Sequence, residues 1–514
     1  WTPDGKGFFY ARYDAPKPGE ALTGANYFQK LYYHRLGTEQ SADTLVLENK
    51  DEKQWGFGAE LSDDDRHVIV NVWKGSGRRN GLMLLPLKNG GFIAGTAPRP
   101  LTMSFDAEYD AVALVGDKLY VRTDKDAPRG RLIAIDIARP EPAAWQTVVA
   151  ESGDALTGAS GVGGRFLLQY LRDAATLVRV HGPDGKQLAE VPLPGVGTAK
   201  GFGGKWDDAE TFFSYASFSS PTEIHRFEPA SGRASLFKRA ATAFPAEQFV
   251  TERHFVTSKD GTRFPVFIAH RKGLKLDGTN PTLLYGYGGF NVPLTPGYSV
   301  TAATWMRMGG VYVSAVLRGG GEYGAAWHEA GTKLSKQNVF DDFIAAAEWL
   351  IAQKYTRPAK LAINGGSNGG LLVGAVLNQR PELFGAAVPQ VGVMDMLRFH
   401  KFTIGWAWVN DYGSADDAEQ FKALQAYSPL HTIRSQRLYP PVLVTTADHD
   451  DRVVPAHSFK YTAALQAADT GPAPKLIRVE TAAGHGAGKP TSKLIEERAD
   501  MLAFMANAFQ LELR

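Results

Sequence analysis

The pattern of apolar and polar positions changes once along the chain, close to residue 245. Before this point, short apolar runs alternate with turns that contain Asp or Gly, and hardly any segment repeats at helical spacing. After Phe244 and Pro245, apolar runs alternate with longer segments in which apolar residues recur at positions i, i+3 and i+4. The change predicts two domains, an all-β domain over residues 1–245 and an α/β domain over residues 246–514.

The first domain contains a series of short predicted strands. Turn-then-strand units recur about every 45 to 60 residues, which is near the blade period of a β-propeller. At about 50 residues per blade, the domain would hold about five blades. An array of two-sheet sandwiches is the alternative, which the regular repetition disfavours. The predicted strands cover residues 7–13, 30–34, 67–73, 82–87, 119–122, 131–137, 166–171, 177–180 and 211–215.

The second domain alternates predicted strands with predicted helices. A lead-in hairpin over residues 255–257 and 264–269 precedes them, and helices include residues 339–353 and a last helix over residues 491–510. This order predicts an α/β-hydrolase, a doubly wound and mostly parallel sheet with catalytic groups on loops at the carboxyl ends of its strands. The later predicted strands cover residues 282–285, 311–317, 361–363, 386–391, 442–446 and 476–480.

The sequence Gly-Gly-Ser-Asn-Gly-Gly at residues 365–370 places Ser367 between a predicted strand and a predicted helix. Glycines are expected where strand and helix approach too closely for side chains, and the turn holds the serine in a strained conformation. Such a turn exposes the hydroxyl, while the backbone N–H of Asn368 begins the helix and points at the group under attack. The arrangement is typical of a nucleophile elbow, and an ordinary glycine-rich turn is the alternative.

An α/β-hydrolase needs an acid and then a histidine after its nucleophile. The predicted strand 442–446 runs into Asp448, Asp450 and Asp451, and periodicity alone does not choose among them. The predicted strand 476–480 runs into a glycine-flanked loop that holds His485, one of 12 histidines. An imidazole in this place would take the proton of the serine hydroxyl, and the acid would fix its tautomer and stabilise the imidazolium.

Composition excludes several other functions. Apolar residues at 44% and charged residues at 21% are typical of a soluble globular protein, and a net charge of +2 gives no reason to expect nucleic acid or a membrane as a partner. No run of about 18 apolar residues could span a bilayer. The chain has no cysteine, so disulfides, thiolate metal sites and thiol catalysis are excluded. This fits a cytoplasmic protein and leaves a periplasmic location open.

Four motifs in the right order resemble the prolyl oligopeptidase family of serine peptidases. They are the serine motif at residues 365–370, the run 449–455 around Asp450, the run 483–490 around His485, and Tyr-Gly-Tyr-Gly-Gly-Phe-Asn at residues 285–291. Residues 31–34 and 59–62 of the β domain are similar as well. The resemblance implies a peptidase that cuts short peptides on the carboxyl side of proline.

The resemblance also implies which residues carry the chemistry. It indicates Asp450 as the acid, His485 as the base and Ser367 as the nucleophile. The hydroxyl of Tyr287 would join the backbone N–H of Asn368 as an oxyanion hole, with two donors aimed at the developing negative charge. A packed aromatic in a glycine-rich turn is the alternative for Tyr287.

The segment 404–413 is similar to the part of the family that lines the proline pocket. Trp408 would stack on the proline ring, which is worth about 0.5 to 1.5 kcal/mol beyond burial. Arg452 would hydrogen-bond a carbonyl of the substrate, with a salt bridge to Asp450 or Asp451 as its alternative. Trp406 departs from the family pattern, which has a smaller polar residue there. The remaining pocket walls would be Phe290, Val393, Ile404, Tyr412 and Val453.

The family has a propeller of seven blades and an upstream segment that completes the hydrolase domain. We therefore expect this propeller to be partial and to lack its first blades, with residues missing before Trp1. In the family the propeller covers the active site and admits only small unstructured peptides. Folded proteins should then be poor substrates.

The sequence thus predicts a serine endopeptidase that hydrolyses short proline-containing peptides through an acyl-enzyme on Ser367. The alternatives are a propeller-gated serine exopeptidase, an oligopeptidase of other specificity, and a catalytically weak propeller module that binds peptides. A lipase or esterase would fit the elbow alone, but a tryptophan-lined pocket with Arg452 beside it suits a peptide better. We expect a monomer with no metal and no organic cofactor.

Overall fold

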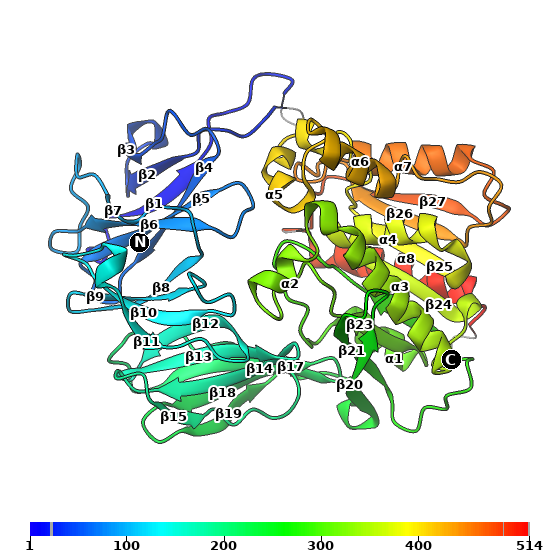
Figure 1. Ribbon diagram of the computed structural model, residues 1–514, viewed down its shortest axis with the longest axis horizontal. Coiled ribbons are helices and arrows are strands. Elements are labelled where there is room, and N and C mark those ends of the chain that lie inside the picture. The colour runs from blue at the N-terminus through cyan, green and yellow to red at the C-terminus, as the bar shows by residue number, and fades with distance from the viewer. Residues whose placement is uncertain (21–23, 487, 512–514) are drawn as a thin grey trace.

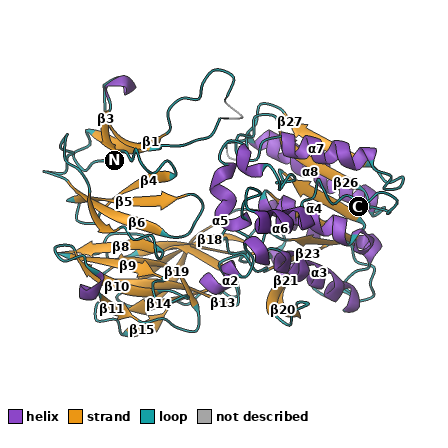
Figure 2. Cartoon of the chain, turned by 45° about the horizontal axis from the view of Figure 1, so that its top comes forward, coloured by secondary structure: helices purple, strands orange, loops and turns teal. Residues whose placement is uncertain are grey.

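The computed structural model describes residues 1–20, 24–486 and 488–511 of the chain. Figure 1 shows two parts side by side, with small sheets in the first half of the chain and a larger sheet flanked by helices in the second. Figure 2 shows that the long helices all belong to the second part. Among the described residues, no helix has the length and apolar character needed to cross a membrane.

Strands β1 to β19 form five antiparallel sheets, each built from strands that follow one another along the chain. The first sheet has three strands and each of the other four has four. Consecutive meandering sheets of this kind are the blades of a β-propeller, in agreement with the sequence prediction. The strands are β1 (Gly7–Arg12), β2 (Lys30–Arg35), β3 (Thr44–Leu47), β4 (Trp55–Leu61), β5 (His67–Lys74), β6 (Asn80–Pro86), β7 (Arg99–Thr102), β8 (Tyr109–Val115), β9 (Lys118–Thr123), β10 (Arg131–Asp136), β11 (Gln146–Val149), β12 (Ala155–Val162), β13 (Arg165–Arg172), β14 (Ala175–His181), β15 (Gln187–Glu190), β16 (Thr198–Gly201), β17 (Thr211–Ser217), β18 (Ser220–Glu228) and β19 (Arg233–Arg239).

The blades are held together by apolar side chains that point from one sheet to the next. In β17 the residues alternate between buried and more exposed positions, so Phe213 and Tyr215 face inward while Phe212 faces out. Phe213 packs in one cluster with Val162, Leu167 and other residues of the preceding blade. This period of two is the reason that short alternating runs build a propeller rather than helices.

The second part is built on one sheet of eight strands, in the order β20-β21-β23-β22-β24-β25-β26-β27. The first two strands form an antiparallel hairpin and β21 pairs antiparallel with β23, whereas the strands from β23 onward are parallel. This is the predicted mostly parallel, doubly wound sheet. The strands are β20 (Phe249–Thr257), β21 (Arg263–Arg271), β22 (Thr282–Tyr285), β23 (Val311–Ala315), β24 (Leu361–Gly366), β25 (Ala386–Gln390), β26 (Val442–Ala447) and β27 (Lys475–Glu480).

Helices cover both faces of this sheet. Helices α3, α4, α6 and α7 contribute to one apolar core with one face of the sheet, and α1 and α8 contribute to a second core with the other face. Successive strand residues divide between the cores, as Ala362 and Ile363 of β24 show. The helices are α1 (Val300–Arg307), α2 (Ala325–Glu329), α3 (Gln337–Ala352), α4 (Asn368–Gln379), α5 (Val409–Tyr412), α6 (Ala418–Tyr427), α7 (Ala456–Ala467) and α8 (Thr491–Ala508). Short 3-10 helices cover Gln40–Ala42, Pro142–Ala144, Ala246–Gln248, Lys333–Ser335, Pro358–Lys360, Pro381–Leu383, Phe399–Lys401 and Gly405–Trp408.

Loops of the two parts touch in several places. Ser76 of the propeller donates to Ala407 O from its backbone nitrogen and from its hydroxyl, at 2.9 and 2.6 Å. The ring of Tyr27 lies 4.9 Å from that of Trp406. The propeller therefore contacts the same short segment, residues 404–413, that the sequence predicts to line the substrate pocket.

Candidate active site

Ser367 lies in a sharp turn between β24 and α4. Its backbone has φ 58° and ψ −115°, in a region that non-glycine residues rarely occupy. A Cβ on Gly365 would lie 2.4 Å from Gly369 O, and one on Gly369 would lie 2.6 Å from Gly286 O. The two glycines are therefore required by the close approach of strand, helix and the loop after β22. The strained serine and these glycines form a nucleophile elbow.

His485 and Asp450 form a hydrogen-bonded pair on the loops that follow β27 and β26. His485 Nδ1 lies 2.6 Å from Asp450 Oδ2. Asp450 is completely buried, and its other oxygen accepts backbone N–H groups from Arg452 and Val453 at 3.1 and 2.9 Å. These bonds stabilise a buried carboxylate, and the carboxylate fixes the proton of His485 at Nδ1. In the neutral imidazole, Nε2 is therefore the nitrogen that can accept a proton.

The other two aspartates of the acid run make no contact with His485 among the described residues. Asp448 instead bonds to the exposed side chain of His449, with Oδ1 2.6 Å from Nδ1. Asp451 is exposed. The structure thus separates three candidates that periodicity left equal, because only Asp450 is directed inward.

Ser367 and His485 line one cavity of about 980 Å³. Its walls come from the sheet and from helices α1 and α8, and they include Tyr285, Gln390 and Met501. Among the hydrogen bonds of the described residues, none joins Ser367 Oγ to His485. Catalytic hydrogen bonds often tighten only when substrate binds, so the missing bond is compatible with the predicted pairing of Ser367 and His485.

Tyr287 and Asn368 lie together at the start of α4. Asn368 Nδ2 donates to Tyr287 O at 2.6 Å, which fixes the backbone of the tyrosine. A Cβ on Gly369 would lie only 3.6 Å from Tyr287 Cδ2, so the ring borders the first turn of the helix. Burial raises the pKa of Tyr287 to about 12, with the charge of Asp411 adding to the rise and Arg452 opposing it. The phenol therefore keeps its proton and stays a hydrogen-bond donor at neutral pH.

Of the residues predicted to form the proline pocket, Tyr412 contacts Asn368 directly and Phe290 packs on Tyr412. Tyr412 donates its hydroxyl to Asn368 Oδ1 at 3.0 Å, and its ring meets Phe290 edge-on with centroids 5.3 Å apart. Val393 and Val453 are buried in the core that includes Tyr412, and Phe290 and Trp408 pack against that core as half-buried residues. Ile404 is half-buried and directly precedes the 3-10 helix Gly405–Trp408.

Two aspects of the pocket were missed by the sequence analysis. Phe399 stacks on Trp408 with ring centroids 6.3 Å apart, and it also contacts Tyr412. Asp411 is buried next to Tyr412 and accepts the backbone N–H of Phe290. Asp411 is the one charged residue of the segment 404–413, and this was the available signal. The side chain of Arg452 is exposed, and its contact with Asp450 is made by its backbone nitrogen.

The glycine-rich loop at residues 318–324 has a structural role. Arg318 is buried and donates to both oxygens of Asp342, at 2.6 and 3.0 Å, and it also pairs with Asp260. Glu322 accepts the backbone N–H of Leu294 at 2.6 Å, and burial raises the pKa of Glu322 to about 8. The loop borders a smaller cavity of about 230 Å³ between the two parts of the chain.

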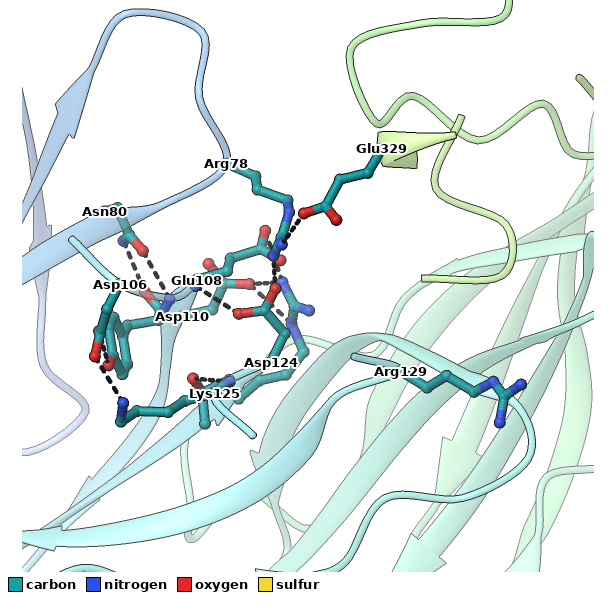
Figure 3. A network of polar contacts seen from close by, with 12 residues as sticks. Arg78, Asn80, Asp106, Glu108, Asp110, Asp124, Lys125, Arg129 and Glu329 are labelled. Atoms are coloured by element: carbon teal, nitrogen blue, oxygen red, sulfur yellow. Dashed lines mark hydrogen bonds and ion pairs between the residues drawn. The ribbon is translucent and has the colours of Figure 1, made fainter. Parts of the chain in front are cut away.

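A charged network in the propeller faces this second cavity (Figure 3). Arg78 pairs with Asp124 of the propeller and, at 3.0 Å, with Glu329 of α2 in the other part. Arg122 is buried and pairs with Glu108 at 3.0 Å. Across the described residues, no group of three or more His, Asp or Glu side chains is placed to hold a metal ion. The pair of Arg78 and Glu329 joins the two parts of the chain by charge.

Comparison with known proteins gives consistent matches. The model of the prolyl oligopeptidase N-terminal beta-propeller domain matches residues 1–240, and that of the prolyl oligopeptidase family matches residues 296–512. The chain is 44% identical over 506 residues to the prolyl endopeptidase of Elizabethkingia meningoseptica. The matched region covers 98% of this chain and 70% of the relative.

Solved structures agree. A structure from a study of two prolyl endopeptidases and their inter-domain dynamics has a TM-score of 0.93 at 42% identity, covering 100% of this chain and 74% of that one. Prolyl oligopeptidase B from Galerina marginata bound to a 35mer substrate has a TM-score of 0.94 at 34% identity, and its apo form has 0.72 at 33%, each covering 100% of this chain and 72% of that one. The chain belongs to the prolyl oligopeptidase family.

Proposed function

We propose that this chain is a serine endopeptidase that cleaves short peptides on the carboxyl side of proline. The observation that carries the proposal is that the bonded pair of His485 and Asp450 shares a cavity with a strained Ser367. The aromatic side chain of Tyr412 binds Asn368, the first residue of the helix that follows Ser367. A relative of 44% identity that is named a prolyl endopeptidase supports the proline specificity.

The proposed division of labour follows the fold. We place the domain boundary between residues 245 and 246, because the last propeller strand ends at Arg239 and the first strand of the large sheet begins at Phe249. Residues 1–245 then form the propeller, and residues 246–514 supply the reacting groups. The expectation that further blades precede Trp1 stays a prediction, as does the cytoplasmic location.

In the proposed reaction, His485 Nε2 takes the proton of Ser367 Oγ as the oxygen attacks the carbonyl carbon of the proline residue. The negative charge on the carbonyl oxygen is stabilised by the Asn368 backbone N–H and the Tyr287 hydroxyl. His485 then gives its proton to the leaving amine, the carbon–nitrogen bond breaks, and an acyl-enzyme remains on Ser367. Water, deprotonated by the same imidazole, attacks the ester and releases the peptide acid while the proton returns to Ser367.

The proposed proline pocket is shaped by rigid aromatic rings. Tyr412 is held by its hydrogen bond to Asn368, and its ring is braced edge-on by Phe290 and Phe399. Trp408 stacks on Phe399, so it offers its other face to a flat apolar ring. Arg452, exposed beside these residues, would donate to a carbonyl of the substrate. We propose that Val393, Ile404 and Val453 complete the walls.

The proposed substrates are small because the two parts of the chain are in contact around the site. The TM-score is 0.94 with the peptide-bound relative and 0.72 with its apo form at nearly equal sequence identity, which supports a closed arrangement here. We also propose that the chain acts as a monomer.

A panel of chromogenic amides tests the proposal. The panel contains a blocked Gly-Pro amide, matched blocked Gly-Ala and Gly-Arg amides, and a Gly-Pro amide with a free amine, with Ser367→Ala as the inactive control. We expect cleavage of the blocked proline substrate and its loss in the variant. Preference for the free amine would indicate an exopeptidase, preference for alanine or arginine would indicate other specificity, and peptide binding without turnover would indicate a binding module.

A further inference from the structure

Asp411 is a buried charged residue that the proposed mechanism does not use. It lies in α5, one residue before Tyr412, and its exposed fraction is 2%. Its Oδ1 accepts the backbone N–H of Phe290 at 3.1 Å and Nε2–H of His328 at 2.8 Å. Because an ionised carboxylate can only accept, His328 carries its proton at Nε2. Two separate segments therefore converge on one oxygen of Asp411.

Lys336 supplies the opposite charge. It is 1% exposed, and its Nζ lies 3.6 Å from Asp411 Oδ2 and 5.3 Å from the centre of the Tyr412 ring. The same Nζ donates to Gly288 O at 2.9 Å. Burial lowers the pKa of Lys336, and the charge of Asp411 opposes that change. A buried ammonium needs this partner, since an unpaired charge in the interior is strongly unfavourable.

The two charges hold the loop that carries Tyr287. Lys336 binds the carbonyl of Gly288, and Asp411 binds the N–H of Phe290, so both bonds fall within three residues of the proposed oxyanion donor. Phe290 and Asn291 both have left-handed backbones, with φ of 57° and 56°. Two consecutive non-glycine residues in this region are unfavourable, so the loop needs contacts from outside to keep its shape.

We propose that Asp411 is a positioning residue that fixes the Tyr287 loop and the pocket helix α5 in one arrangement. The reasoning rests on the proposed function, because it assigns Tyr287 to the oxyanion hole and Tyr412 to the proline pocket. Asp411 acts through Phe290 N–H on one side and through its place next to Tyr412 on the other. Tyr412 in turn holds Asn368, whose side chain binds Tyr287 O. The carboxylate of Asp411 therefore positions both the proline pocket and the oxyanion hole.

The test compares two double variants in which both buried charges are removed, so neither leaves an unpaired charge. In Asp411→Asn with Lys336→Met, the amide oxygen still accepts from Phe290 N–H. In Asp411→Leu with Lys336→Met, the acceptor is lost at similar volume. Asp416→Asn is the matched control, because this exposed carboxylate five positions away pairs with Lys401 and His400, which are not part of the Tyr287 loop.

We expect kcat of the leucine variant for a blocked Gly-Pro amide to be about 10²-fold lower than that of the wild type. The reason is that the Tyr287 hydroxyl would be displaced from its position in the oxyanion hole. The KM of this variant should rise by a smaller factor, because the ring contacts of Tyr412 with Phe290 and Phe399 remain in the pocket. Inhibition by a peptide aldehyde ending in proline, whose adduct places an oxyanion in the hole, should weaken in parallel with kcat. In the asparagine variant, kcat and the strength of aldehyde inhibition should both be close to those of the wild type. Equal kcat and equal aldehyde inhibition in the two double variants would overturn the proposal.

A second measurement is independent of turnover. Amide hydrogen exchange of residues 287–291 should be faster in the leucine variant than in the asparagine variant, with equal exchange in the strands of the large sheet. Equal exchange of the loop would contradict the proposal. If the wild-type chain fails to cleave any amide, the proposed function fails, and the exchange comparison still decides the role of Asp411. If the leucine variant does not fold, Asp411→Ser with Lys336→Met replaces it. The side chain of serine is one bond shorter than that of aspartate, so its hydroxyl does not reach Phe290 N.

Discussion

Removal of the Tyr287 hydroxyl tests the oxyanion hole with a change of one atom. In Tyr287→Phe the ring keeps its place beside Gly369, and Asn368 Nδ2 still binds the backbone carbonyl of residue 287. The loop should therefore keep its shape. Because the pKa of Tyr287 is raised to about 12, less than about one molecule in a thousand lacks the phenolic proton at pH 8, and the wild-type donor is essentially always present.

We expect a large decrease in kcat, because the variant lacks one of the two hydrogen-bond donors that stabilise the negative charge of the transition state. Loss of one oxyanion donor typically lowers kcat by about 10² to 10³, or roughly 2.7 to 4 kcal/mol of transition-state stabilisation. The Asn368 backbone N–H remains and should leave measurable activity. KM should change little, because the neutral carbonyl of the bound substrate forms only a weak hydrogen bond with the Tyr287 hydroxyl.

The assay is steady-state hydrolysis of a blocked Gly-Pro amide by Tyr287→Phe, with Tyr355→Phe as the control. Tyr355 is also a buried tyrosine, but it follows α3 and its hydroxyl faces His254. We expect the control to keep kcat close to that of the wild type. A Tyr287→Phe variant with an unchanged kcat, or one in which only KM rises, would refute the assignment of Tyr287 to the oxyanion hole.

Three further predictions follow from the pocket, the contact between the two parts and one buried acid. Trp408→Ala should raise KM for the proline substrate at least about tenfold, since stacking adds about 0.5 to 1.5 kcal/mol to the burial of the ring. Glu329→Gln removes the partner of Arg78 across the two parts, and it should raise kcat/KM for a 30-residue peptide relative to a tetrapeptide, as measured by mass spectrometry. Exposed ion pairs contribute about 0 to 1 kcal/mol, so the ratio of kcat/KM for the long peptide to kcat/KM for the tetrapeptide should rise about fivefold at most. Glu322→Gln should remove a pH dependence of stability. Because burial raises the pKa of Glu322 to about 8, the folded wild type retains a proton that the unfolded chain loses above about pH 4.5, and its stability should fall from there up to about pH 8. The variant should gain up to about 1.4 kcal/mol per pH unit relative to the wild type in this window, as followed by urea unfolding.

Each of these predictions has a control and a result that would contradict it. An equal rise of KM for a matched alanine substrate would show that Trp408 does not recognise proline. Glu348→Gln removes an exposed partner of Arg380 outside the contact, and an equal change of size selectivity in this control would contradict the role of Glu329. A difference in stability between Glu322→Gln and wild type that stays constant from pH 5 to pH 8 would contradict the titration of Glu322.

Local pattern predicted the elements of the hydrolase half well. The helical period over residues 339–353 corresponds to α3 (Gln337–Ala352), and the last predicted helix corresponds to α8 (Thr491–Ala508). The elbow at Ser367 could be predicted because its serine and glycines stand together in one short stretch between a predicted strand and a predicted helix. The close approach of Gly286 O to Gly369 comes from the distant loop after β22, and no pattern in the sequence indicated that contact.

Long-range polar contacts could not be predicted in the same way. The choice of Asp450 over Asp448 and Asp451 came from the family resemblance, because all three aspartates follow the same strand. The pair of Lys336 and Asp411 joins residues from α5 and the segment before α3, and no local pattern indicates that these charges meet in the interior. Their burial is a result of how the loops pack, which periodicity does not describe.

The acyl-enzyme is the central claim of this account, and mass spectrometry tests it directly. The chain is mixed with a blocked Gly-Pro p-nitrophenyl ester, quenched in acid within the burst of p-nitrophenol release, and digested. The account predicts a mass increase equal to the blocked Gly-Pro acyl group on the peptide that contains Ser367, far less labelling with the Gly-Ala ester, and none in Ser367→Ala. Rapid hydrolysis with the acyl group on another residue, or equal labelling by both esters, would contradict it.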